Sequence, residues 1–296
     1  MFDGFERASV VLDQVAIHYR RSWSGVASKP GLLLLHGHPQ THAIWHRVAA
    51  PLAQRFDVVC ADLRGYGDSG KPAPQPGHGN YSKRAMAADM AQLMARLGFE
   101  EFCVVGHDRG GRVAHRLAAD HPHAVRRLAL LDVAPTLAMY EQTSMAFARA
   151  YYHWFFLIQP APLPETLIGA DPEFYLLQTL GGRHAGLAPF APEALAEYRR
   201  CIRLPDTVRG ICEDYRASAT IDLEHDRADV AAGRLLPMPL LALWGEHGAV
   251  GQCFRPLDEW RRRAADVRGH ALPCGHYIAE EVPQLLLDEL LPFLED

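Results

Sequence analysis

The residues with the clearest capacity for chemistry lie in the stretch Gly-His-Asp-Arg-Gly-Gly, residues 106–111. Asp108 stands between Gly106 and Gly110, after an apolar run and before a helical pattern. A strand, a sharp glycine-flanked turn and a helix form a nucleophile elbow, which lifts the central side chain above a sheet. A simpler interpretation is that Asp108 only caps the helix that follows it. The pattern therefore indicates either a nucleophilic carboxylate or a helix cap.

A histidine and two further carboxylates stand where a catalytic set would need them. His276 comes just after the last predicted strand, which is the usual place of a general base in such a set. The acid that orients it is either Asp132 or Glu246, each of which follows a predicted strand. Asp132 is favoured because it ends a strand and a proline follows two residues past Val133. The order Asp108, Asp132, His276 is that of nucleophile, acid and base.

An aspartate at an elbow supports a chemistry different from that of serine. Asp108 would attack carbon in line, expel halide or open an epoxide, and become an ester. Water activated by His276 would then hydrolyse this ester. The backbone N–H groups of His38, in the loop His-Gly-His-Pro, and of Arg109 are predicted to form the oxyanion hole for that step. The base is therefore needed in the second step and not in the first.

Two arginines follow the predicted nucleophile, Arg109 directly and Arg112 one helical turn later. A guanidinium group binds a carboxylate through two parallel hydrogen bonds. Two such groups would hold an anionic substrate beside an anionic nucleophile, an approach that like charge otherwise opposes. The spacing of Arg112 is equally that of an exposed helix residue. The sequence thus favours a small anionic substrate.

An α/β fold is predicted to position these residues. Short apolar runs alternate with amphipathic helical patterns, which indicates a mostly parallel sheet covered by helices on both faces. A hairpin is predicted over residues 8–23 and a helix over residues 43–56. The alternation is interrupted once, by a helical and aromatic segment. We therefore expect a core of residues 1–135 and 230–296, and a helical cap of residues 136–229 over the ligand crevice.

The composition excludes several classes of protein. The chain has 296 residues, 49% of them hydrophobic, and a net charge of −5, without a basic cluster beyond Arg261–Arg263. Nucleic acid and membrane are therefore not expected as partners. The start lacks a signal-peptide pattern, and six scattered cysteines suggest free thiols, so a cytoplasmic protein is expected. The 16 histidines show no metal-ligand spacing, and neither a metal nor another cofactor is predicted.

Nearly end to end, the chain resembles the fluoroacetate (haloacetate) dehalogenases, a family with the α/β-hydrolase fold and a helical cap. The resemblance is carried by HGHPQ, VVCADLRGYGDSGKP, VGHDRGGR, ARAYYHWFF, QPAPLPE, IGADPEFY, EDYRASATIDLEHD and GHYIAEE. It implies hydrolysis of a haloacetate to glycolate and halide, in a homodimer. It also implies Asp108 as nucleophile, His276 as base, Asp132 as acid, and Arg109 and Arg112 as carboxylate ligands.

The same resemblance implies that His153, Trp154 and Tyr215 bind the leaving halide. An imidazole N–H, an indole N–H and a phenol O–H are neutral donors that can replace water around a small anion. From periodicity alone, Trp154 and Tyr215 would be assigned to the apolar core of the cap. The haloacetate assignment therefore depends on the resemblance at these positions.

The chain departs from the family pattern at two positions. His38 stands where a phenylalanine is usual, and Gly182 or Arg183 stands where a cap tryptophan is usual. Both positions are predicted to lie near the pocket. The departures leave open which halogen and which substrate size are preferred, while the displacement residues are all present.

Two rival functions share some of these features. An epoxide hydrolase would use the same aspartate and two cap tyrosines, with Tyr215 and either Tyr151 or Tyr152 as candidates. A neutral epoxide has no need of two arginines beside the nucleophile, which counts against it. A non-catalytic protein of the same fold usually lacks a member of the catalytic set, and none is missing from this sequence.

Overall fold

The computed structural model describes residues 1–22 and 29–296 and contains the predicted α/β core. Eight strands form one sheet in the order β1-β2-β4-β3-β5-β6-β7-β8. β1 pairs with β2, and β2 with β4, in antiparallel fashion, whereas the other neighbours are parallel. The strands are β1 (Glu6–Val11), β2 (Ala16–Arg21), β3 (Gly31–Leu35), β4 (Asp57–Ala61), β5 (Phe102–His107), β6 (Val125–Leu131), β7 (Leu240–Gly245) and β8 (Val267–Leu272).

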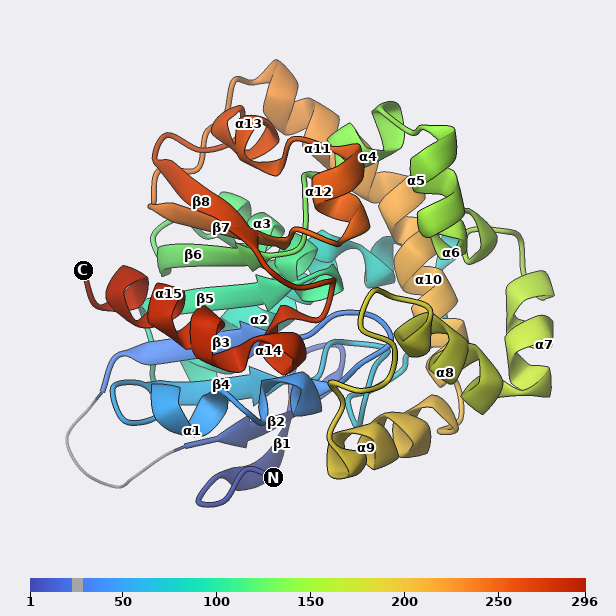
Figure 1. Ribbon diagram of the computed structural model, residues 1–296, viewed down its shortest axis with the longest axis horizontal. Coiled ribbons are helices and arrows are strands. Elements are labelled where there is room, and N and C mark those ends of the chain that lie inside the picture. Colours follow the sequence, from blue (N-terminus) through green and yellow to red (C-terminus); the bar gives the residue numbers. More distant parts are fainter. Residues whose placement is uncertain (23–28) are drawn as a thin grey trace.

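Helices cover both faces of the sheet, as the continuous apolar strands predict (Figure 1). In β3, Leu33 and Leu35 point into one apolar cluster, and Leu32 and Leu34 point into the other. The first cluster includes residues of α2 (Lys83–Arg96) and α3 (Arg109–Asp120). The second includes residues of α1 (Ala49–Leu52) and α15 (Pro283–Glu295), with α14 (Ile278–Glu281) beside them. Because both faces are buried, the parallel strands are held in one register and their carboxyl ends share one edge.

The chain leaves the sheet after β6 and returns to it at β7. Between them it forms helices that lie beyond one edge of the sheet, at the right of Figure 1. These helices are α4 (Thr136–Glu141), α5 (Met145–Ala150), α6 (Tyr152–Phe156), α7 (Leu163–Ala170), α8 (Pro172–Gly181), α9 (Pro192–Ile202), α10 (Thr207–Ala219) and α11 (Ile221–Ala231). We refer to α4–α11 as the cap. The remaining short helices of the core are η1 (His42–Trp45), η2 (Pro76–Tyr81), α12 (Ala249–Cys253) and α13 (Pro256–Arg261).

The helix predicted over residues 43–56 is wrong in its length. Instead of one helix over residues 43–56, the chain forms the 3₁₀ turn η1 and the single-turn helix α1. Pro51 has no backbone N–H and is tolerated only in the first turn of a helix, so a helix that contains it begins just before it, at Ala49. The predicted hairpin is present as β1 and β2, although residue 23 of its range lies outside the described residues.

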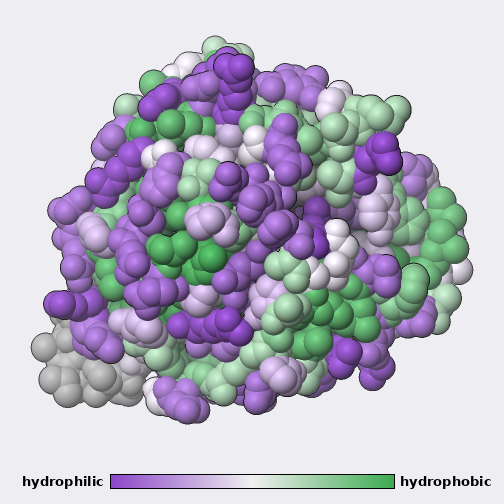
Figure 2. Space-filling model, in the orientation of Figure 1, coloured by the Kyte–Doolittle hydropathy of each residue, from purple (hydrophilic) through white to green (hydrophobic). Residues whose placement is uncertain are grey.

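The surface is mixed in character. All six cysteines are free, and all except Cys253 are buried. No helix in the described ranges combines the length and apolarity needed to cross a membrane. Figure 2 shows hydrophobic residues at the right-hand edge of this face, where α7 lies. Exposed apolar side chains of α7 and α8 include Leu163, Leu167 and Phe174.

Candidate active site

Asp108 occupies a strained turn between β5 and α3. Its backbone has φ 46° and ψ −111°, a conformation that non-glycine residues keep only where the surroundings impose it. A Cβ atom on Gly106 would lie 2.5 Å from the carbonyl oxygen of Gly110, which is too close for any side chain. The absence of a side chain at Gly106 therefore lets β5 and α3 approach each other closely. The Asp108 side chain makes no capping hydrogen bond to α3. The carboxylate is therefore displayed by the turn and does not serve as a helix cap.

The Asp108 carboxylate is buried but kept ionised. The backbone N–H of His38 donates to its Oδ2 at 3.0 Å, so the amide predicted for the oxyanion hole faces the candidate nucleophile. Burial alone would raise the pKa of Asp108, but His276 and Arg112, helped by other basic neighbours, hold it well below its usual range. Arg109 begins α3, where the first backbone N–H groups have no partner within the helix.

His276 is held by one of the two candidate acids. Its Nδ1–H donates to Asp132 Oδ2 at 2.5 Å, and the other carboxylate oxygen of Asp132 accepts from the Gly245 N–H at 2.9 Å. His107 also orients the segment, since its Nε2–H donates to the carbonyl of His276 at 2.8 Å. Glu246, the alternative acid, is exposed. The structure thus brings His276 together with Asp132 and leaves Nε2 as the imidazole nitrogen free to act on water.

The guanidinium groups of Arg109 and Arg112 are both buried and only partly satisfied. Arg109 Nε donates to Asp214 Oδ2 at 2.8 Å, and its Nη2 donates to Asp214 Oδ1 at 2.9 Å. Arg112 Nη1 donates to the Thr136 hydroxyl at 2.8 Å and to the Ala134 carbonyl at 3.1 Å. Arg109 Nη1 and Arg112 Nε have no hydrogen-bond partner among the described residues. Buried donors without partners are costly, so these two indicate room for an anion.

The three residues that the resemblance assigns to the halide lie together within the cap. Tyr215 of α10 has its ring centroid 5.8 Å from that of His153 and 6.5 Å from that of Trp154, both on α6. The Trp154 Nε1 and the Tyr215 hydroxyl are buried and lack a partner within residues 1–22 and 29–296. Burial holds the pKa of His153 well below its usual range, so its imidazole is neutral. Neutral donors therefore converge here.

The arginines and the halide residues are in direct ring contact. The Arg109 guanidinium lies 4.0 Å from the centroid of the Tyr215 ring, and that of Arg112 lies 4.5 Å from the centroid of the Trp154 ring. Such cation–π contacts link each predicted carboxylate ligand to a predicted halide ligand. The two groups of free donors thus belong to one site.

The two departures from the family pattern differ in their surroundings. His38 is buried, shares a hydrogen bond of 3.1 Å with the Tyr175 hydroxyl, and stacks on His153 at 5.9 Å between centroids. Burial lowers the pKa of His38 to about 3, so its imidazole adds no charge. Gly182 is exposed, whereas the Arg183 guanidinium lies 4.6 Å from the ring centroid of Tyr151. Of the two candidates at the second departure, Arg183 is therefore the one that faces the site, and His38 lies within it.

Several residues of the site escaped the sequence-based prediction. Asp214, which binds Arg109, and Tyr175, which binds His38, were not predicted, and Tyr151, considered only as an epoxide ligand, has its hydroxyl 3.4 Å from His276 Nδ1. These partners come from cap helices far along the chain, so no spacing signal connects them to the elbow. Asp214 directly precedes Tyr215, and that adjacency is the only local hint of its place.

One buried group of candidate metal ligands lies away from Asp108. Among the described residues, ligand atoms of His18, His42 and Asp62 lie within 4.8 Å of one another. Asp62 Oδ1 accepts from the N–H and Nδ1–H of His42 at 2.7 and 2.9 Å, and Oδ2 accepts from the Asp68 N–H at 3.0 Å. Asp62 therefore braces the loop after β4, with three N–H donors on its two carboxylate oxygens.

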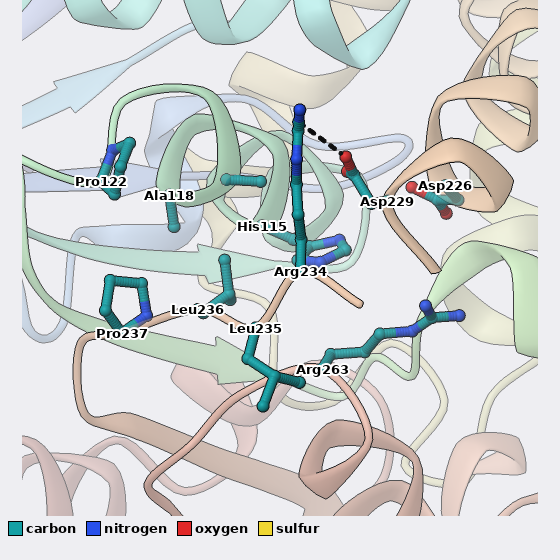
Figure 3. A pocket seen from close by; sticks show the side chains of 11 residues that line it. His115, Ala118, Pro122, Asp226, Asp229, Arg234, Leu235, Leu236, Pro237 and Arg263 are labelled. Carbon is teal, nitrogen blue, oxygen red and sulfur yellow. Dashed lines mark hydrogen bonds and ion pairs between the residues drawn. The ribbon is translucent and has the colours of Figure 1, made fainter. Parts of the chain in front are cut away.

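A cavity of about 310 Å³ opens along the C-terminal half of α3 (Figure 3). Its polar side carries the ion pair between Arg234 and Asp229, with an N–O distance of 3.0 Å. The apolar side is formed by Ala118, Ala119, Pro122, Leu235, Leu236 and Pro237. None of the predicted site residues lines it, so this cavity is separate from the candidate active site.

Glu280 forms another buried contact between core and cap. Its side chain is fully buried and accepts hydrogen bonds from the Tyr198 hydroxyl of α9 and, at 3.3 Å, from the Gln40 amide. Burial raises the pKa of Glu280 to about 8. This carboxyl group is therefore protonated in the folded protein at neutral pH.

Comparisons with known proteins agree with this geometry. A family model described as the alpha/beta hydrolase fold matches residues 30–281, which defines the class of protein. A fluoroacetate dehalogenase from Burkholderia sp is 48% identical over 297 residues, covering 100% of this chain and 96% of the relative. A soluble epoxide hydrolase from Corynebacterium sp. (strain C12) is 35% identical over 280 residues, or 93% of each chain.

A solved structure from Nostoc sp PCC 7120, assigned as an alpha/beta hydrolase, matches with a TM-score of 0.94 and 53% identity over 99% of both chains. The chain therefore belongs to the haloacetate dehalogenase family of the α/β hydrolases. The predicted fold class and the stated resemblance are both confirmed.

Because Glu280 is buried, we expect it to make the free energy of unfolding depend on pH. An unfolded glutamate has a pKa of about 4.3. The pKa of Glu280 is higher in the folded protein than in the unfolded chain. The contribution of this side chain to the free energy of unfolding is therefore present at low pH and is lost as pH rises toward about 8. In Glu280→Gln, the decrease in unfolding free energy between pH 6 and pH 9 should be about 2–3 kcal/mol smaller than in the wild type. Urea unfolding at both pH values measures this difference in free energy, and the exposed Glu224→Gln serves as the control variant. If the unfolding free energies of Glu280→Gln and the wild type changed in parallel with pH, the raised pKa of Glu280 would be contradicted.

Proposed function

We propose that this protein hydrolyses haloacetates to glycolate and halide through an ester of Asp108. The observation that carries the proposal is a set of four buried donors without partners among the described residues. Two are guanidinium N–H groups, on Arg109 and Arg112, and two are neutral donors, on Trp154 and Tyr215. A haloacetate has a carboxylate for the first pair and a halogen for the second.

In the first step, the ionised Asp108 carboxylate attacks the carbon that bears the halogen. A carbon–oxygen bond forms as the carbon–halogen bond breaks, and the electron pair leaves with the halide. The Trp154 N–H, the Tyr215 O–H and the His153 imidazole hydrogen-bond the departing ion in place of water. Arg109 and Arg112 hold the substrate carboxylate and offset its repulsion by the nucleophile.

In the second step, His276 Nε2 takes a proton from water while Asp132 holds Nδ1–H. The resulting hydroxide attacks the carbonyl carbon of the Asp108 ester. The N–H groups of His38 and Arg109 stabilise the oxyanion, which collapses to release glycolate and regenerate the carboxylate. The departing glycolate oxygen takes the proton held by His276, and the proton left on the Asp108 carboxyl group passes to solvent, so the net reaction consumes one water and releases one proton per halide.

The epoxide-hydrolase alternative fits the site less well. Tyr215 has a free buried hydroxyl, but Tyr152 is exposed, and the Tyr151 hydroxyl lies beside His276 Nδ1. A neutral epoxide would also leave the free donors of Arg109 and Arg112 without partners. Burying unpaired cationic donors is unfavourable, which supports an anionic substrate.

We also propose that the protein works in the cytoplasm as a homodimer. The free cysteines are consistent with a reducing compartment. The exposed apolar side chains of α7 and α8, Leu163, Leu167 and Phe174, offer a surface that a second copy could cover.

A substrate panel tests the proposed reaction directly. Purified protein should release fluoride from fluoroacetate and chloride from chloroacetate, with glycolate as the second product of each. A terminal epoxide should give no diol under the same conditions. Halide electrodes and chromatography of the products measure these outcomes. Diol formation without halide release would instead establish the epoxide hydrolase.

The proposed mechanism uses Asp108 in the first step and His276 only in the second, and this predicts the behaviour of the variant His276→Asn. Without the base, alkylation of Asp108 should proceed while hydrolysis slows by about 100- to 10,000-fold, a range typical of general-base loss. Mass spectrometry after exposure to chloroacetate should find one carboxymethyl group on the peptide that contains Asp108. Asp132→Asn should show a related defect, whereas the exposed Glu246→Gln should turn over like the wild type. Unmodified Asp108 together with lost turnover would refute this division of roles.

A further inference from the structure

Asp214 of the cap helix α10 is the most heavily bonded carboxylate beside the site. Its side chain is completely buried, yet it accepts hydrogen bonds from three different core residues. Lys83 Nζ donates to Oδ1, and the Tyr66 hydroxyl donates to Oδ2 at 2.7 Å. Arg109 donates to both oxygens, through Nη2 and Nε. Burial alone would raise the pKa of Asp214, but Arg109 and Lys83 lower it well below the usual range, so it is ionised.

This bonding decides which edge of the Arg109 guanidinium remains free. Nε and Nη2 point at the carboxylate of Asp214, and Nη2 also donates to its backbone carbonyl at 2.9 Å and to the Ser218 hydroxyl at 2.6 Å. A two-point contact fixes a planar guanidinium in both position and tilt. Only Nη1 is left without a partner in the described chain. The direction of that donor is thus set by α10.

The same helix also carries a predicted ligand of the halide. Tyr215 follows Asp214 in α10, and its ring lies under the guanidinium of Arg109 at 4.0 Å. In Figure 1, α10 runs along the edge of the sheet on the cap side. One turn of α10 therefore supplies both Asp214, which binds the predicted carboxylate ligand Arg109, and Tyr215, a predicted halide ligand.

We propose that Asp214 is a positioning residue that orients Arg109 for the substrate carboxylate, so that the docked cap completes the anion-binding site. The proposal rests on the proposed haloacetate chemistry. Asp214 does not touch the substrate, because its oxygens are taken up by Lys83, Tyr66 and Arg109. Without it, Arg109 would keep its charge but lose its fixed direction.

A purely structural role is the alternative, and the chain contains a matched control for it. Arg116, also on α3, forms buried ion pairs with Asp226 and Asp229 of α11, at 3.1 and 2.7 Å. Asp226 is therefore another cap carboxylate that binds a core arginine of the same helix. It does not contact Arg109, so Asp226→Asn tests loss of a cap–core ion pair without a change at the anion site.

The experiment compares two inhibitors that occupy different halves of the site. Acetate presents only a carboxylate, and bromide only a halide, so inhibition by each reports on one set of ligands. In Asp214→Asn, the inhibition constant for acetate and the KM for chloroacetate should both rise, by about 10- to 100-fold, a loss typical of a misplaced binding group. The inhibition constant for bromide should change by less than about threefold, since the halide donors remain. Asp226→Asn should leave all three values within the same threefold limit.

A second variant guards against misfolding. Removing Asp214 alone leaves Arg109 buried without its carboxylate partner and leaves Lys83 with only the more distant Asp222, at 3.7 Å, which destabilises the protein. The double variant Lys83→Met/Asp214→Asn removes one charge of each sign and should fold, while Arg109 still lacks its two-point contact. It should show the same selective loss of acetate affinity, which isothermal calorimetry measures without any turnover.

The possible results distinguish failure of the positioning role of Asp214 from failure of the proposed haloacetate hydrolysis. Equal loss of acetate and bromide affinity in Asp214→Asn, or full recovery of acetate affinity in the double variant, would overturn the positioning role. Absence of halide release by the wild type would overturn the proposed function instead. Acetate binding by calorimetry still tests Asp214 in that case, because it does not depend on the reaction.

Discussion

The proposed reaction depends on one electrostatic constraint, the approach of an anionic substrate to an anionic nucleophile. Two unit charges 4 Å apart repel each other by about 4 kcal/mol at an effective dielectric constant of about 20. Asp108 is ionised and buried, so this repulsion is not screened by water. The buried cations Arg109 and Arg112 stand next to it in the chain, at the start of the same helix. In the proposed reaction, these positive charges offset the repulsion between substrate and nucleophile.

The fold supplies the positions that this constraint requires. Parallel strands bring the loops after β3, β5, β6 and β8 to one edge, which places His38, Asp108, Asp132 and His276 near one another. The cap then adds Trp154 and Tyr215 above the arginines through ring contacts. The side chains of this layer are buried, which strengthens each electrostatic interaction among them. In the proposed reaction, the core thus provides the displacement chemistry, and the cap provides the groups that receive the halide.

Much of this could be read from the sequence, because local patterns carry it. The apolar runs of β3, β4 and β5 are continuous, and the glycines around Asp108 mark the elbow. The roles of Trp154 and Tyr215 could not be derived in this way, since a cap-core aromatic has the same spacing. Asp214 was missed because its partners Lys83 and Arg109 lie more than 100 residues earlier in the chain. The helix over residues 43–56 was overestimated because periodicity outweighed the effect of Pro51.

The central claim is that Asp108 itself donates oxygen to the product, and isotope transfer tests it most directly. Enzyme in excess over chloroacetate is allowed one turnover in water enriched in heavy oxygen, and the glycolate and the peptide containing Asp108 are analysed by mass spectrometry. If Asp108 is the nucleophile, the first glycolate carries ordinary oxygen in its new hydroxyl group, and the label appears in the Asp108 carboxylate. Label in the hydroxyl of the first glycolate, with an unlabelled Asp108, would mean that water attacks the substrate directly and would contradict the account.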